Sequence, residues 1–175
     1  SGGTLTGTTS SLQGNILNNA AVAFSQSTDG TYAGVMSGTG GLTKSGTGNL
    51  TLTGTNSYTG GTTVSGGTLT GTTSSLQGNI ANNAAVVFNQ GTDGTYAGNM
   101  SGTGGFTKNG AGNLTLTGTN SYAGGTTINS GTLTGNSASL QGNIANNAAL
   151  VFNQATNGTY AGAITGSGSL TKTGA

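Results

Sequence analysis

Acid–base chemistry in this chain of 175 residues depends on very few side chains, since it has three Lys, two Asp and no His, Cys, Arg or Glu. General acid–base catalysis needs a positioned His or a pair of carboxylates. Asp29 and Asp93 hold equivalent places in two successive copies of a long repeat, and Asn157 holds that place in the third copy. Asp-Gly and Asn-Gly serve tight turns equally well. We therefore interpret these residues as turn formers and predict no catalytic residue and no enzyme activity.

The sequence predicts no cofactor and no metal site. Hard cations need several oxygen ligands with carboxylates among them, and residues 28–31 lack the G-G-x-G-x-D pattern of calcium-binding β-rolls. Residues 38–44 are rich in Gly but lack the G-K-[ST] ending of a phosphate-binding loop. A net charge of +1 without Arg argues against a nucleic-acid partner. No apolar run approaches the ~18 residues of a spanning helix, so we expect no direct membrane insertion by this segment.

Rows of Thr and Tyr are the remaining candidates for chemistry, in the form of surface binding. Strands of the type Thr-x-Thr place two hydroxyls on one face, as ice-binding solenoids do, although an ice plane needs such a pair on every coil. The aromatic rings could serve as platforms for glycans or host surfaces, or else anchor corners with the hydroxyl reaching water. The candidate surface-binding residues are Thr51, Thr53, Tyr58, Thr115, Thr117 and Tyr122.

The three lysines are too far apart in sequence to form a basic patch. Lys44, Lys108 and Lys172 recur once in each copy of the repeat. Charged side chains on strands commonly discourage sideways pairing of sheets. We therefore expect these lysines to lie on a solvated strand face.

All of these residues follow one period, because the chain repeats itself without a gap. The repeats span residues 1–64, 65–128 and, in part, 129–175, and only ten positions differ between the first two. Periods of this size are typical of solenoids and arrays, in which each unit buries its apolar face against the next. We expect a single β-solenoid segment over residues 1–175, cut from a longer protein.

The elements that carry this period are short strands. Frequent Gly and the lack of a 3.6-residue apolar pattern argue against helix, whereas Leu and Thr alternate in residues 48–54. The expected strands of the first unit are residues 3–6, 11–16, 20–26, 31–36, 41–44, 49–53 and 58–65. Apolar residues that we expect to point into the core, here called anchors, recur at a nearly constant spacing of about a third of a unit. The spacing is seen from Leu5 to Phe24, from Phe24 to Leu42 and from Leu50 to Leu69. The sequence therefore predicts an all-β fold, a parallel β-helix with about three coils per repeat.

One stretch resembles a known family. Residues 41–69 resemble the autotransporter-associated β-strand repeat, whose pattern is L-T-K-x-G-x-G-x-L-x-L-x-G-x-N-x-Y-x-G-x-T-x-V-x-x-G-x-L. Residues 106–133 match the pattern with Phe106 for the first Leu and Ile128 for Val, and residues 170–174 open a third copy. The resemblance implies a right-handed parallel β-helix from the passenger of an autotransporter, secreted across a Gram-negative outer membrane and displayed or shed.

The expected function is structural. We expect this segment to build length at a bacterial cell surface or in an extracellular protein, as the stalk of an adhesin or the body of a fibre. Its expected partners are copies of itself, stacked end to end or side by side, and in addition a host or neighbouring cell surface. The alternatives are a self-assembling matrix filament and a binding module for ice or glycans.

Overall fold

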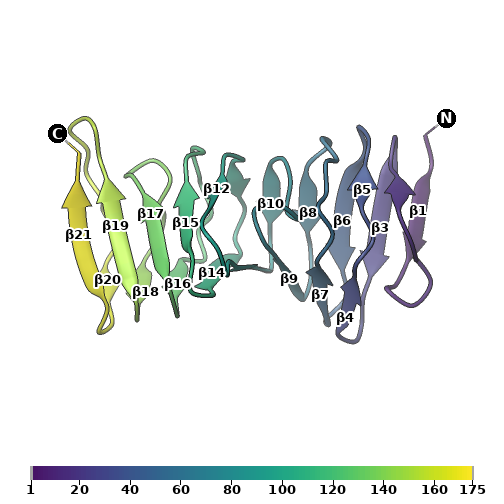
Figure 1. The fold of residues 1–175 in the computed structure, drawn as a ribbon, viewed down its shortest axis with the longest axis horizontal. Coiled ribbons are helices and arrows are strands. Elements are labelled where there is room, and N and C mark those ends of the chain that lie inside the picture. Colours follow the sequence, from purple (N-terminus) through teal and green to yellow (C-terminus); the bar gives the residue numbers. More distant parts are fainter. Residues whose placement is uncertain (1, 175) are drawn as a thin grey trace.

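The computed structural model describes residues 2–174 and contains strands and turns but no helix in that range. The chain winds into a rod with its two termini at opposite ends (Figure 1). Every strand pair is parallel. Paired residues are 17 to 20 positions apart in the sequence: Thr4 pairs with Ala21, and Ala21 pairs with Gly41. The prediction of a parallel β-solenoid is confirmed.

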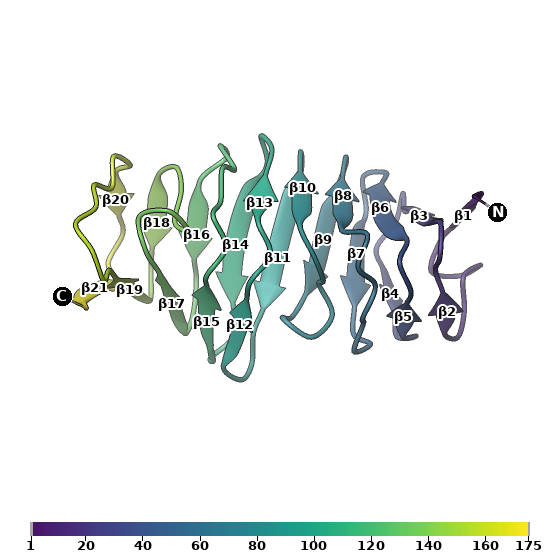
Figure 2. The ribbon, with the colours of Figure 1, turned by 90° about the horizontal axis from the view of Figure 1, so that it is seen from above.

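Each coil visits three sides of the rod in turn, and Figure 2 shows the coils following one another along the axis. We call the three large sheets I, II and III. Sheet I contains β1 (Thr4–Gly7), β3 (Ala21–Ser25), β6 (Gly41–Ser45), β8 (Thr62–Val64), β10 (Ile80–Asn82) and β13 (Met100–Ser101). Sheet II contains β4 (Gly30–Tyr32), β7 (Asn49–Leu52), β9 (Thr68–Gly71), β11 (Ala85–Asn89), β14 (Gly105–Asn109), β16 (Thr126–Ile128), β18 (Ile144–Asn146) and β20 (Ile164–Thr165).

The third side carries two sheets, one near each end of the rod. Sheet III contains β12 (Gly94–Tyr96), β15 (Asn113–Leu116), β17 (Thr132–Gly135), β19 (Ala149–Asn153) and β21 (Ser169–Thr173). The other sheet is the pair β2 (Ile16–Leu17) and β5 (Met36–Ser37). In the first coils this pair forms the third side, because β5 follows a strand of sheet II and precedes a strand of sheet I. Between them, residues 53–61 and residues 72–79 cross the third side without forming a strand.

Each unit begins on a different side of the rod from the unit before it, which is a rotation of one third of a turn about the rod axis. Thr4, Thr68 and Thr132 are equivalent in the repeat, yet they lie in sheets I, II and III. From β1 to β9 the chain therefore makes three full coils and advances by one further side. The expected three coils per unit are thus refined to three and one third, and every side of the rod displays the same sequence at a different height.

The core consists of inward side chains that stack in columns along the axis. In sheet I, Leu5 pairs in register with Val22, and Val22 with Leu42. In sheet II, Leu50 pairs with Leu69, as the sequence predicted, and Val86 with Phe106. Side chains such as these stabilise the fold by about 1.5–3 kcal/mol each when fully buried.

Three expected strands differ in the structure. Residues 11–16 include a turn closed by hydrogen bonds from the nitrogens of Ser11 and Leu12 to the carbonyl of Thr8, and only Ile16 belongs to a strand. Residues 31–36 divide between β4 and β5 because the chain changes sides there, and residues 58–65 shorten to β8. The anchor spacing was also wrong for two of its three pairs, since the partner of Leu5 in the next coil is Val22 rather than Phe24, and the partner of Phe24 is Lys44 rather than Leu42.

Candidate functional site

The two candidate tyrosines lie inside the solenoid. Tyr58 and Tyr122 are 1% and 2% exposed, and their hydroxyls lie 2.8 Å from the hydroxyls of Thr62 and Thr126. Burial raises the pKa of both phenols, and these hydrogen bonds act in the opposite direction. The expectation of exposed aromatic platforms is wrong for these residues, because the ring fills the core and the hydroxyl is bonded to a neighbouring side chain rather than to water.

The other three tyrosines are also used within the fold. The hydroxyls of Tyr32 and Tyr96 each donate to a backbone carbonyl one coil earlier, those of Gly14 and Gly78, at 2.6 Å. Tyr160 makes the equivalent bond to Gly142. The rings of Tyr32 and Tyr96 pack against Phe24 and Phe88, with centroids 5.2 and 5.0 Å apart. These tyrosines therefore connect coils.

The four candidate threonines face outward but do not share a side. Thr51 and Thr115 are half-buried, and Thr53 and Thr117 are exposed. Thr51 belongs to β7 in sheet II and Thr115 to β15 in sheet III. The rotation between units thus separates the two pairs, so that equivalent residues of successive units do not build one continuous binding face.

A hydroxyl column does run along sheet II, with interruptions. Thr31, Thr51 and Thr70 are in register, and Val87 follows in the next coil. Thr51, Thr53, Thr70, Thr72 and Asn89 line a shallow hollow of about 170 Å³ on this side. Pairs of Thr therefore occur on two neighbouring coils here and again in sheet III, where Thr115 pairs with Thr134. Val87 and Val151 end these two runs, so each is shorter than a flat ice-binding plane needs.

The lysines occupy the core rather than a solvated face. Lys44 and Lys108 have no exposed surface. The ammonium of Lys44 donates to the carbonyls of Ser45, Gly46 and Gly66 at 2.8, 2.9 and 2.9 Å. Burial lowers the pKa of both lysines because desolvation disfavours the charged form. The prediction of solvated lysines is wrong for these two residues, whereas Lys172 in the last coil is exposed.

The sequence held a signal for these buried lysines. Lys44 stands two residues after Leu42, which places both side chains on the same face of β6, and the burial of that strand alternates accordingly. The prediction of a solvated lysine relied on its charge and not on this alternation of buried and exposed positions. Carbonyl oxygens that accept from all three N–H groups of the ammonium make such burial tolerable.

The two carboxylates lie at exposed corners on different sides of the rod. A side-chain oxygen of Asp29 accepts from the nitrogen of Asn49 at 2.8 Å, and Asp93 and Asn113 repeat this contact at 2.8 Å. Within residues 2–174, no group of three or more His, Cys, Asp or Glu side chains is placed to hold a metal ion. The same part of the chain has no helix long and apolar enough to cross a membrane.

Corner asparagines make the same kind of contact as these aspartates. The side-chain oxygens of Asn15, Asn79 and Asn143 accept from backbone nitrogens in the next coil, at distances between 2.8 and 3.0 Å. These side chains therefore bind consecutive coils together.

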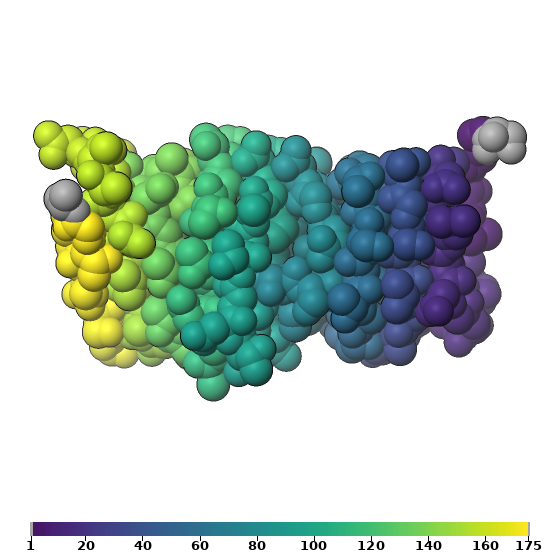
Figure 3. Space-filling model, turned by 45° about the horizontal axis from the view of Figure 1, so that its top comes forward, coloured from purple at the N-terminus to yellow at the C-terminus, as the bar shows by residue number. Residues whose placement is uncertain are grey.

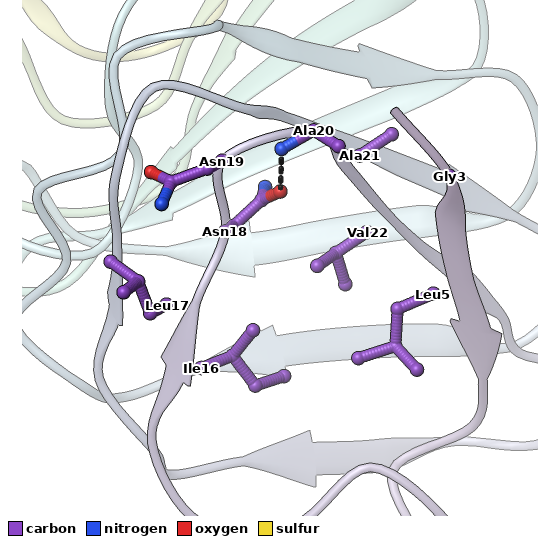
Figure 4. Close-up of a pocket in the computed structure, with 9 residues that line it drawn as sticks. All are labelled: Gly3, Leu5, Ile16, Leu17, Asn18, Asn19, Ala20, Ala21 and Val22. Carbon is purple, nitrogen blue, oxygen red and sulfur yellow. Dashed lines mark hydrogen bonds between the residues drawn. The ribbon is translucent and has the colours of Figure 1, made fainter. Parts of the chain in front are cut away.

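The hollow at the first coil is lined by core residues. It measures about 270 Å³, and Figure 4 shows Leu5, Ile16 and Val22 pointing into it from three segments. The nitrogen of Ala20 donates to the side chain of Asn18 at its rim (Figure 4). The equivalents of the three apolar residues in the second unit are buried, so the hollow exposes the interior of the coil. The long face of the rod drawn in Figure 3 shows no deep cleft.

Comparison with known protein families finds a similarity in two parts of the chain. Residues 42–73 and 106–134 match a sequence family described as the passenger-associated-transport-repeat. Together with the parallel β-solenoid, this confirms the resemblance to the β-helix repeats of autotransporter passengers. No curated protein matches the chain, and no solved structure does.

Proposed function

We propose that this chain is a structural, non-catalytic segment that builds length in a bacterial cell-surface or secreted protein, as a passenger stalk or the body of a fibre. The passenger-associated repeat supports the location. The use of buried tyrosine and lysine groups for contacts between coils supports the structural role.

The observation that carries this proposal is the geometry of the unit. Each unit adds three coils and one third, about 16 Å at ~4.8 Å per coil, and presents the same contacts to the next unit. Stability in such an array depends on contacts between neighbouring repeats. Length therefore increases with unit number without any new interaction.

Insertion of whole units tests the proposal. Copies of residues 65–128 inserted after Ile128 are expected to lengthen the rod by about 16 Å each, measured by small-angle scattering. A label on Asn153, which follows the insertion point, should also change its side of the rod relative to the first two units with each inserted unit and return to the original side after three. Growth in width rather than length, or loss of folding on insertion, would contradict the proposal.

A second candidate function is self-assembly through the sides of the rod, with a second copy of this chain as the partner. Two of the three lysines are buried, so Asp29, Asp93 and Lys172 are the exposed charges within residues 2–174. Surfaces with so little charge associate readily. Because all three sides display the same sequence, association produces bundles rather than isolated dimers.

The area of one side sets the strength of this association. Eight strands in sheet II at ~4.8 Å spacing and about 15 Å width give roughly 600 Å², less than the ~800 Å² per partner of a stable interface. We therefore expect weak association of this chain and stronger association with each added unit. Sedimentation of the insertion series tests this. Thr107 and Thr127 lie in register on neighbouring strands of sheet II, so Thr107→Lys with Thr127→Lys should weaken association by removing that side. Sedimentation as a monomer at every length would exclude self-assembly and leave the stalk.

A further inference from the structure

The environment of the buried lysines is the same in two units that lie on different sides of the rod. Lys44 stands in the inward column of sheet I, between Phe24 in the preceding coil and Val64 in the next. Lys108 stands between Phe88 and Ile128 in sheet II. The apolar stem of each lysine is therefore part of the core, while its ammonium reaches the corner after the strand.

The ammonium is held entirely by the backbone. Lys108 donates to the carbonyls of Asn109, Gly110 and Ser130 at 2.8, 2.7 and 3.1 Å, which repeats the arrangement around Lys44. The acceptors in the two units differ in side chain, with Ser130 in place of Gly66 and Asn109 in place of Ser45. The remaining acceptor is Gly in both units, Gly46 and Gly110, so the groups that bind the ammonium are carbonyl oxygens and recognition does not depend on the side chains.

No carboxylate takes part in this arrangement. The side-chain oxygens of Asp29 and Asp93 accept from Asn49 and Asn113 at the exposed corners. The positive charge is therefore stabilised by carbonyl dipoles, as a metal ion is in a site built of backbone oxygens.

We propose that the corner after the strands of Lys44 and Lys108 is a cation-binding cage of three backbone carbonyls, that its ligand class is the primary ammonium, and that the unit's own lysine is its tethered occupant. Two of the oxygens, from Ser45 and Gly46, belong to one coil, and the third, from Gly66, belongs to the next. The ammonium thus connects two consecutive coils, because it binds carbonyl oxygens from both, as a metal ion connects the segments that supply its ligands.

The number of donors explains the choice of ligand. An ammonium on a side chain has three N–H donors, one for each oxygen, and a neutral amine has two. The planar fork of a guanidinium does not suit three converging oxygens. A side chain without donors at this position leaves buried carbonyls unpaired, which is unfavourable.

The absence of Cys from the chain allows a direct chemical test. The variant Lys44→Cys is alkylated while unfolded, either with 2-bromoethylamine, which rebuilds an ammonium at the reach of Lys, or with 1-bromopropane, which adds a chain of the same length without charge. Each product is refolded and its thermal unfolding is followed by circular dichroism. Lys172→Cys, at an exposed position, is the matched control.

We expect the propyl product of Lys44→Cys to melt at least about 5 °C below the parent chain, or to remain unfolded, and the aminoethyl product to recover most of this loss. The two products of Lys172→Cys should differ by much less. Equal recovery with the propyl group would overturn the proposal, because it would show that only packing of the stem matters. Failure of the aminoethyl group to restore stability would overturn it as well.

Discussion

The side-chain oxygen of Asn56 accepts a hydrogen bond from the nitrogen of Met36 at 2.8 Å, one coil earlier, and its amide nitrogen donates to the carbonyl of Ser75 at 2.8 Å, one coil later. Asn120 repeats both bonds with Met100 and Ser139. These asparagines stand where residues 53–61 and their equivalents in the second unit cross from one side to the next without a strand. A single amide therefore replaces part of the missing backbone pairing between three coils.

Replacement of this amide is expected to be costly. Asn56→Ala leaves the nitrogen of Met36 and the carbonyl of Ser75 unpaired inside the rod, which should lower the free energy of unfolding by about 3 kcal/mol. Denaturant unfolding measures the change. Asn19→Ala is the matched control, because Asn19 is exposed and its bond to the nitrogen of Thr39 is long, at 3.4 Å. Equal losses in the two variants would show that Asn56 does not bridge the coils.

Close approach of neighbouring coils makes Gly98 intolerant of any side chain. A Cβ at Gly98 would lie 2.1 Å from the carbonyl oxygen of Gly78, the atom that accepts from the hydroxyl of Tyr96. Gly98→Ala should therefore separate the coils and lower the free energy of unfolding by about 2 kcal/mol or more.

The chain itself supplies the control for this glycine. A Cβ at Gly91 would meet nothing within 4 Å, and the equivalent positions hold Ser27 and Ala155. Gly91→Ala should be neutral or stabilise the fold by about 0.5 kcal/mol through the unfolded state. Destabilisation of similar size in both variants would contradict the assigned spacing between coils.

Buried lysines should resist amine-directed labelling. Acetylation of the native chain by an N-hydroxysuccinimide ester is expected to modify Lys172 at least about tenfold faster than Lys44 or Lys108, since a closed core restricts access until it opens locally. Peptide mass spectrometry over time measures each site, and labelling in denaturant supplies the control in which all three react alike. Rapid labelling of Lys44 in the native chain would contradict its burial.

The sequence was sufficient for the fold class, since the fixed period and the alternation of Leu and Thr in residues such as Leu50 and Thr51 specify stacked parallel strands. The rotation between units was not predictable from anchor spacing alone. The distance between paired residues varies from 17 to 20 positions, because some corners contain a turn such as the one closed at Thr8, and the sum of these uneven coils decides which side each unit begins on.

The candidate site was harder to predict, because some residues whose type suggests exposure stand at strand or loop positions that face the core. Tyr58 and Lys44 have polar groups that suggest exposure, yet both side chains point into the core. Their polar ends are satisfied by groups in the same or the next coil, which the sequence does not reveal until the register is known. Thr51 and Thr53 were placed outward correctly, but their relation to Thr115 depends on the rotation.

Alkaline pH should unfold the rod through its tyrosines. Burial raises the pKa of Tyr32, Tyr58, Tyr96 and Tyr122 above the ordinary value of 10.0, and burial followed by the charge of Tyr122 raises the pKa of Tyr160 to about 12. A raised pKa in the folded state contributes stability that is fully present below pH 10 and is lost as the pH rises through the folded values.

The buried lysines change the stability of the fold in the opposite direction, at lower pH than the tyrosines do. The lowered pKa of Lys44 and Lys108, from an ordinary value of 10.5, means that the unfolded chain keeps these protons to higher pH than the folded chain. Stability from this source therefore rises with pH until about 10.5 and is constant above it. We expect stability to be greatest near pH 10 and to fall steeply between pH 10 and 12.

Two signals followed together during an alkaline titration test this expectation. Circular dichroism reports the strands, and absorbance near 295 nm reports ionised tyrosine. In the folded rod the buried phenols stay protonated, so tyrosinate should form only as the strands melt, and both signals should change in one step above pH 10. The variant Tyr58→Phe should move that step to higher pH, because it removes one ionisable ring while keeping the core filled. Titration of most tyrosines near pH 10 with the strands intact would contradict the burial of these rings.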